Sequence, residues 1–230
     1  MSDAARPAFY ALRPGGWRDY VTLLHLPYTL WHLSYVALGA ALAPRMQWGL
    51  LGWTVLAFAL AMGIGAHALD ELQGRPLRTQ IPSSVLVGLA AVSIVAACAI
   101  GAVAAARTTL WLIAFIVFGG LVVVAYNLEL VGGAFHSDVW FAGAWGAFPV
   151  LTAYFASAER IRGEAVAAAG FAFLVSLAQR RLSTEVRRVR RGGVPPVDAV
   201  LALEAPEAAL RLLSAALPLL AGAALLMRVG

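Results

Sequence analysis

The sequence contains no lysine, one cysteine and little charge of either sign. Charged residues make up 13% of its 230 positions and apolar residues 61%. A typical soluble domain is about 25% charged and about 45–50% apolar. This excess of apolar residues is too large for an ordinary core and indicates an integral membrane protein. The single Cys98 excludes an intrachain disulfide, and its apolar surroundings are typical of a small buried hydrophobe.

All 17 basic residues are arginines, and the net charge is +5. A basic chain can bind nucleic acid, but these arginines cluster at the ends of apolar runs. In a membrane protein such clusters usually set the orientation and contact anionic lipids, so we expect no nucleic-acid partner. Residues 1–16 lack the basic-then-apolar pattern of a cleaved signal and are expected to form a short cytoplasmic tail.

The apolar runs predict an all-α, polytopic membrane helix bundle with about seven transmembrane helices in a single domain. Each run is close to the roughly 20 residues that the bilayer core requires. The expected spans are 18–43, 47–69, 84–106, 109–130, 138–157, 164–180 and 205–228. Between the last two spans, residues 181–204 are expected to form a basic cytoplasmic loop.

The arginines also predict the orientation of the bundle. If the N-terminus is inside, the inner segments hold the arginines of the first 18 residues, of the loop after the second span and of the run 180–191. The outer loops then hold fewer arginines. By the positive-inside rule, we expect a cytoplasmic N-terminus in a bacterial inner (plasma) membrane.

A cluster of polar residues ends the second span. In "HALDEL", His67, Asp70 and Glu71 share one face of a helix, and Arg75 and Arg78 follow at once. One interpretation is that the acids and arginines form weak pairs among the lipid headgroups. The other is that the acids bind a divalent cation while the arginines grip phosphate oxygens.

Three stretches resemble the UbiA superfamily of intramembrane prenyltransferases. The first is an acid at the end of the second span followed by "GRPLRTQIP". The second is "HLPYTLWHLSYVALGA" at 25–40, and the third is "VVVAYNLELVGGAFHSDVWFAGAWGAFPVLTAYFA" at 122–156. The similarity extends over roughly residues 20–190, and it depends on the order and spacing of the three pieces.

The resemblance implies an all-α fold, typically of nine transmembrane helices, that binds a polyprenyl diphosphate through Mg²⁺ and transfers the prenyl group to an acceptor. Departure of the diphosphate builds negative charge, which metal ions and arginines stabilise. Asp70 and Glu71 would be the catalytic residues. They would also bind the metal, together with His67. The residues expected to bind the substrate are Arg75, Arg78, Asn127, Arg180 and Arg181.

The sequence departs from the family pattern in ways that favour a second hypothesis. The first Asp-rich motif is reduced to Asp70 and Glu71. In place of the second motif, Glu185 is the only acid in "LAQRRLSTEVRRVRRGG", and about two spans are missing. A degenerate, non-catalytic relative that binds a lipid or a protein partner would show these losses. Glu129, at the end of the fourth span, is either an interface residue or a second carboxylate that faces an inner polar cavity beside Asp70.

A third hypothesis is a metal- or haem-dependent membrane oxidoreductase that uses the four histidines. His25, His32, His67 and His136 all fall on the inner half of the expected bundle. Imidazole suits zinc, iron and copper. The four lack a compact ligand spacing, which favours the simpler interpretation that each is hydrogen-bonded separately within the bundle. The sequence leaves the oligomeric state open.

Overall fold

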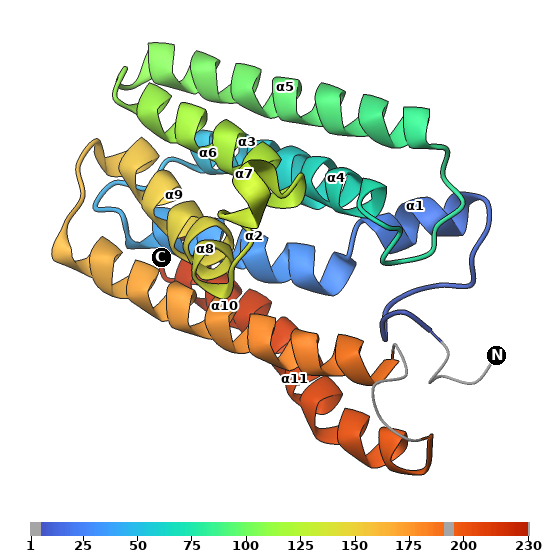
Figure 1. Ribbon diagram of the computed structural model, residues 1–230. Coiled ribbons are helices and arrows are strands. Elements are labelled where there is room, and N and C mark those ends of the chain that lie inside the picture. Colours follow the sequence, from blue (N-terminus) through green and yellow to red (C-terminus); the bar gives the residue numbers. More distant parts are fainter. Residues whose placement is uncertain (1–5, 191–195, 230) are drawn as a thin grey trace.

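The computed structural model describes residues 6–190 and 196–229, which form helices and no strand (Figure 1). The first half of the chain contains α1 (Trp17–Leu23), α2 (Leu26–Leu42), α3 (Trp48–Phe58), η2 (Ala59–Ala66), α4 (His67–Leu72), α5 (Ser83–Arg107) and α6 (Leu112–Asn127). The second half contains α7 (Leu130–Gly133), α8 (Asp138–Phe141), η3 (Ala142–Ala147), α9 (Phe148–Ala158), α10 (Gly163–Arg190) and α11 (Pro196–Leu226).

In the described part of the chain, five helical segments are long and apolar enough to cross a membrane, which supports an integral membrane protein. They are Trp48–Leu72, Ser83–Arg107, Asp138–Ala158, Gly163–Arg190 and Leu201–Leu226. The other two expected spans are shorter, because α2 has 17 residues and α6 has 16. The helical membrane bundle is therefore confirmed, but the predicted count of seven spans is not.

The first expected span, 18–43, is broken near its start. His25 adopts a left-handed backbone conformation with φ of 46°, which separates α1 from α2. Such a conformation is uncommon for a residue other than glycine, and a regular helix does not continue through it. The break places His25 immediately before the first turn of α2.

The expected basic loop at 181–204 is wrong for most of its length. Helix α10 continues to Arg190 and α11 begins at Pro196, while residues 191–195 lie outside the described part of the chain. The arginines of this segment extend a helix because Val186 and Val189 are buried together with Leu203 and Leu210 of α11. Packing against a neighbouring helix thus orders a segment whose composition alone indicated a loop.

The N-terminal stretch is also more ordered than the expected cytoplasmic tail. Of its residues, 1–5 lie outside the described part. In the remainder, Ala11 is buried and the amide of Leu12 donates to Thr22 Oγ1 at 3.0 Å. Residues 6–16 are therefore folded against the start of the bundle.

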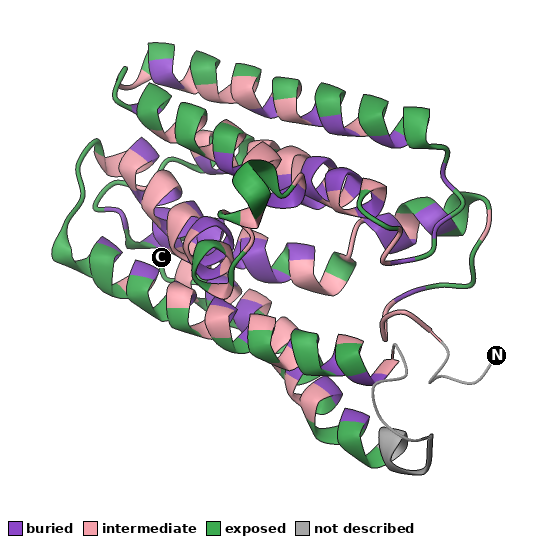
Figure 2. Cartoon of the chain, viewed as in Figure 1, coloured by how far each residue is buried: buried purple, intermediate pink, exposed green. Residues whose placement is uncertain are grey.

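Helix α2 runs through the middle of the molecule and packs against α9 and α11 (Figure 1). Trp31 and Tyr35 are fully buried in its core with Val150, and Trp31 Nε1 donates to Tyr35 Oη at 2.7 Å. Helix α10 covers η3 and α11, while α5 covers η2 and α6. The outward faces of α5 and α10 are exposed (Figure 2), as expected of helices that face lipid.

Two long segments contain a stretch of π-helix. The wider turns of η2 continue into α4, and those of η3 continue into α9. A π-helical stretch changes the phase of the residues that follow it and is frequently found at functional sites. In this chain, η2 sets the direction in which the polar residues of α4 project.

Candidate functional site

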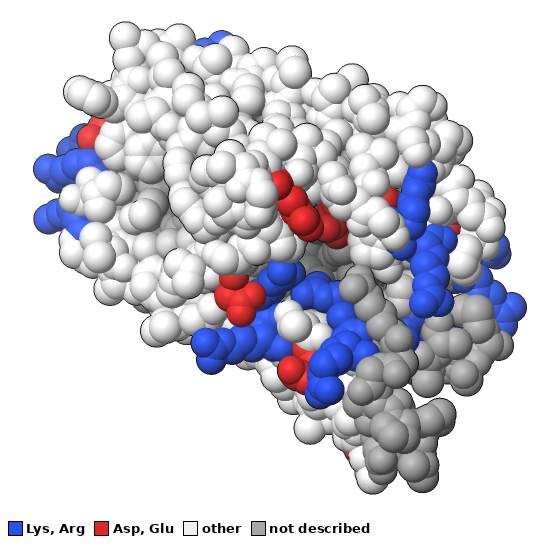
Figure 3. Space-filling model, viewed as in Figure 1, with Lys and Arg blue, Asp and Glu red and all other residues white. Residues whose placement is uncertain are grey.

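A polar cavity of about 420 Å³ lies at the end of the bundle that contains the N-terminal segment. Its walls come from residues 7–10, the start of α2, the end of α4 with the loop after it, and the last turns of α10. Arginine side chains gather around a hollow on this part of the surface (Figure 3). The charged side chains that line the cavity are Asp70, Arg75, Arg78, Arg187 and Arg190.

The loop after α4 brings its two arginines to the cavity by an unusual path. Gly74, Arg75 and Arg78 all have positive φ, at 79°, 55° and 57°. Arg75 donates from Nη1 to Ile81 O at 2.5 Å and from Nη2 to Ser83 Oγ at 2.8 Å, so it also fixes the start of α5. Arg78 lines the cavity with an exposed side chain.

The two acids of "HALDEL" have different surroundings. Asp70 is half-buried and lines the cavity. Glu71 is fully buried and accepts hydrogen bonds from Leu77 N at 2.9 Å and from both the amide and the hydroxyl of Thr79 at 2.8 Å. Both carboxylate oxygens of Glu71 are therefore engaged within the loop, and Asp70 alone of the two faces the cavity.

Helix α10 contributes Arg187 and Arg190 to the lining of the cavity. From the sequence alone, both were only members of the basic run 180–191. Arg190 Nε donates to Glu207 Oε1 at 2.7 Å, in an ion pair with α11. Arg187 is half-buried and donates to Thr184 Oγ1 at 3.2 Å. Among the described residues, no carboxylate oxygen lies within 4.0 Å of its guanidinium nitrogens. The helical spacing of the buried residues of α10 could have indicated, from the sequence, which of its arginines lie on the side that faces the cavity.

The other expected substrate-binding residues lie outside the lining of the cavity. Arg180 donates to Asp138 Oδ1 at 3.3 Å and lies 3.2 Å from His136 Nε2. Its guanidinium also lies over the ring of Phe141, 5.5 Å from the centroid. Asn127 is buried and donates to Val123 O at 2.7 Å.

Three further polar residues that the sequence singled out are exposed. Arg181 is exposed on α10, and Glu185 forms an ion pair with Arg188 at 2.7 Å. Glu129 lies 3.9 Å from a ring nitrogen of His136, with its own side chain 56% exposed. Neither glutamate lines the polar cavity, so Asp70 is the only carboxylate that does so in the described part of the chain.

The four histidines do not converge. His25 and His67 stack with their ring centroids 3.9 Å apart, which directs their nitrogens along parallel planes rather than toward one point. His32 instead lies against Phe141, and His136 stacks on Tyr126. Within the described ranges, no group of three or more His, Cys, Asp or Glu side chains is placed to hold a metal ion.

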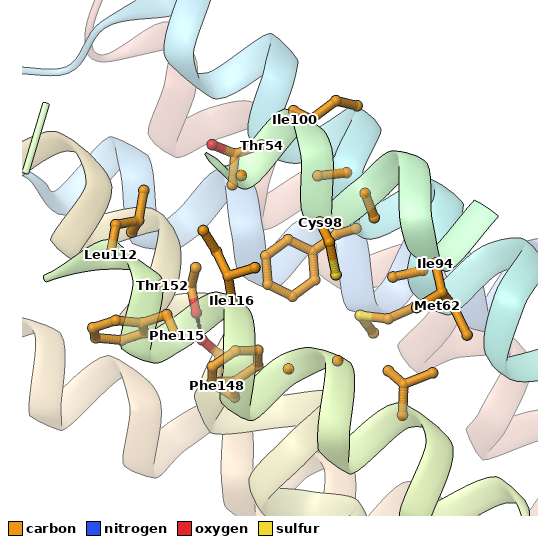
Figure 4. Close-up of a pocket in the computed structure, with 18 of the residues that line it drawn as sticks. Thr54, Met62, Ile94, Cys98, Ile100, Leu112, Phe115, Ile116, Phe148 and Thr152 are labelled. Atoms are coloured by element: carbon orange, nitrogen blue, oxygen red, sulfur yellow. Dashed lines mark hydrogen bonds between the residues drawn. The ribbon is translucent and has the colours of Figure 1, made fainter. Parts of the chain in front are cut away.

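A second, apolar cavity of about 110 Å³ lies between α3 with η2, α5, α6 and η3 with α9 (Figure 4). Met62, Ile94, Cys98 and Phe148 are among the side chains that line it. Met62 and Asp70 lie on one continuous helical segment, eight residues apart, which corresponds to about 12 Å along a helix. The molecule therefore has an apolar and a polar cavity at neighbouring levels of the same helix.

Comparison with known proteins adds no identification. No family model, no curated protein and no solved structure matches this chain. The resemblance to the UbiA superfamily therefore stays a prediction, supported by the sequence stretches that suggested it.

Proposed function

We propose that this membrane protein binds a lipid with a phosphate or diphosphate headgroup, and that an isoprenoid diphosphate is its ligand. One observation carries the proposal. Among the described residues, the polar cavity is lined by four arginines, of which Arg190 is paired with Glu207 of α11, and by a single carboxylate, Asp70. Arginine forks bind phosphate oxygens in two-point contacts, so this excess of positive charge suits an anionic headgroup.

The two cavities together suit an amphiphile. Arg78 and Arg187 would hold the headgroup, while Arg75 holds the wall of the cavity through Ile81 and Ser83. The apolar cavity beside Met62 and Phe148 would take part of the hydrocarbon chain. Apolar cavities favour apolar ligands because burying such a surface away from water is favourable.

Prenyl transfer with Mg²⁺ is the reaction that the resemblance predicts. Asp70 fits one position in the coordination of Mg²⁺, because this ion commonly uses one or two carboxylates together with substrate phosphates and water. When bound, the ion would neutralise charge on the departing diphosphate. The residues of this chain would bind and orient the diphosphate, with Arg187 reaching the cavity from α10 and Arg78 from the loop.

A lipid-binding protein without transferase activity is the second candidate. The hydrogen bonds of Glu71 favour it, because they occupy a carboxylate that the family would use for metal. The two candidates share the binding step and differ only in chemistry. Release of inorganic diphosphate in the presence of an aromatic acceptor would therefore distinguish a transferase from a binder.

The binding step is tested with the purified protein in nanodiscs. We expect farnesyl diphosphate to bind at least tenfold more tightly than farnesol, which has the same chain and no phosphate. Equal affinity for the two ligands would contradict the proposal, because the arginines would then contribute nothing to recognition.

We also propose that this end of the bundle faces the cytoplasm of a bacterial inner membrane. The positive-inside rule supports this orientation, since Arg75 and Arg78 of the loop after α4 and Arg187 and Arg190 of α10 line one cavity together with the N-terminal segment. In a Cys98→Ser background, Glu185→Cys should react with a membrane-impermeant maleimide only in inverted vesicles. Labelling from the periplasmic side alone would show the opposite orientation and contradict this proposal.

A further inference from the structure

Glu71 occupies a position where the sequence suggested a metal ligand, yet its hydrogen bonds give it another role. Its side chain has no exposed surface. Oε2 accepts from Leu77 N at 2.9 Å, and Oε1 accepts from Thr79 N and Thr79 Oγ1, both at 2.8 Å. One carboxylate thus satisfies three donors of the loop that follows its own helix.

These donors lie on the two sides of Arg78. Leu77 and Thr79 are its immediate neighbours, so Glu71 fixes the peptide units that flank this arginine. The backbone of Arg78 is left-handed, with φ of 57°, and so is that of Arg75, with φ of 55°. Residues with a Cβ atom disfavour this conformation, so the loop requires an external restraint to keep it.

A second buried carboxylate holds the next residue of the loop. Asp19 of α1 is 3% exposed and accepts from Gln80 N at 2.8 Å through Oδ2. Its Oδ1 accepts from Gly15 N at 2.9 Å. The loop is therefore held from α4 by Glu71 and from α1 by Asp19. The second contact ties it to the N-terminal segment that forms another wall of the cavity.

We infer that Glu71 is a positioning residue, which holds the loop so that Arg78 presents its guanidinium group to the anion site, while Arg75 ties the loop to Ile81 and Ser83. The inference rests on the proposed function, in which Arg78 binds phosphate. It assigns the carboxylate to backbone and hydroxyl donors rather than to a metal ion. Because the hydrogen bonds of Glu71 involve no ligand, its contribution to binding should be the same with and without Mg²⁺.

The discriminating variant is Glu71→Gln, which keeps the size of the side chain and replaces one acceptor oxygen with an amide donor. One loop donor then loses its acceptor. We expect amide hydrogen exchange in a peptide covering residues 73–82 to become about tenfold faster or more. The matched control is Asp70→Asn, which changes the neighbouring acid that lines the cavity and leaves the hydrogen bonds of Glu71 intact.

Binding of inorganic pyrophosphate to the full chain in nanodiscs gives the second readout. Glu71→Gln should weaken it about tenfold both with Mg²⁺ and with EDTA. A loss confined to Mg²⁺ would make Glu71 a metal ligand and overturn the inference, and so would unchanged exchange in the loop. If the wild type does not bind pyrophosphate, the proposed function fails. The exchange measurement alone then decides whether Glu71 holds the loop.

A milder pair of variants covers the case in which Glu71→Gln does not fold. Thr79→Val removes the hydroxyl donor and leaves the two backbone donors in place. It should speed exchange in the same peptide by a smaller factor, and Thr79→Ser should restore protection. Identical exchange in Thr79→Val and the wild type would contradict the inference.

Discussion

The imidazole rings of His25 and His67 stack face to face, with centroids 3.9 Å apart and planes inclined by 15°. His67 Nδ1 also hydrogen-bonds to Gly63 O at 3.1 Å, which fixes the orientation of its ring. His25 lines the polar cavity at the head of α2. The contact therefore joins the start of α2 to the start of α4, the helix that carries Asp70.

The stack predicts a loss of stability in acid. Burial lowers the pKa of His25 well below its usual 6.5, and the nearby His67 and Arg187 lower it further. Below pH 6.5 the unfolded chain binds a proton that the folded chain does not, so stability falls as the pH falls. By pH 5.5 the loss should reach at most about 1.4 kcal/mol.

Thermal unfolding in detergent between pH 7.5 and pH 5.5 measures this effect. His25→Gln should reduce the acid-induced drop in Tm, since the titrating group is gone. The control is His136→Gln, which removes a histidine whose side chain is 27% exposed. It should keep the drop. An unchanged drop in His25→Gln would show that other groups cause the acid sensitivity.

A second prediction concerns the contact between η3 and α10. A Cβ atom at Gly146 would lie 2.5 Å from Ala172 O and 2.7 Å from Ser176 Oγ. Gly146→Ala should therefore destabilise the protein by about 1–3 kcal/mol, because the backbone of α10 must move. Gly143 lies in the same helical stretch, and no atom of the described residues lies within 4 Å of a Cβ atom placed there. Gly143→Ala should leave Tm unchanged or slightly higher, and an equal effect of both variants would contradict the packing argument.

The sequence predicted the boundaries of the membrane helices well where a long apolar run was enough to define the helix. The expected span 84–106 differs by one residue at each end from Ser83–Arg107, and the expected span 138–157 ends one residue before Asp138–Ala158. It failed at 181–204, where charge suggested a loop. There the helix depends on contacts between Val186 and Leu210 from different segments, and periodicity in one segment does not reveal its partner.

The site was predictable only in part, for a similar reason. The sequence suggested that Asp70, Arg75 and Arg78 act together, and the structure places all three in one cavity. The sequence did not reveal that Glu71 accepts hydrogen bonds from the loop. Thr79 approaches Glu71 only because Arg75 and Arg78 have left-handed backbone conformations. Arg187 was also missed as an individual residue, since its direction depends on how α10 packs.

We propose that the arginines of the cavity bind a phosphorylated headgroup, and a comparison of variants at two neighbouring arginines of α10 is the sharpest test. Arg187 lines the cavity, whereas Arg188 is exposed and paired with Glu185 at 2.7 Å. Arg187→Gln should weaken farnesyl diphosphate binding in nanodiscs by about 1.5–3 kcal/mol, the scale of a hydrogen bond to a charged group. Arg188→Gln should change it by about 0–1 kcal/mol, as for an exposed ion pair. Equal dissociation constants for the two variants would show that Arg187 does not contact the headgroup.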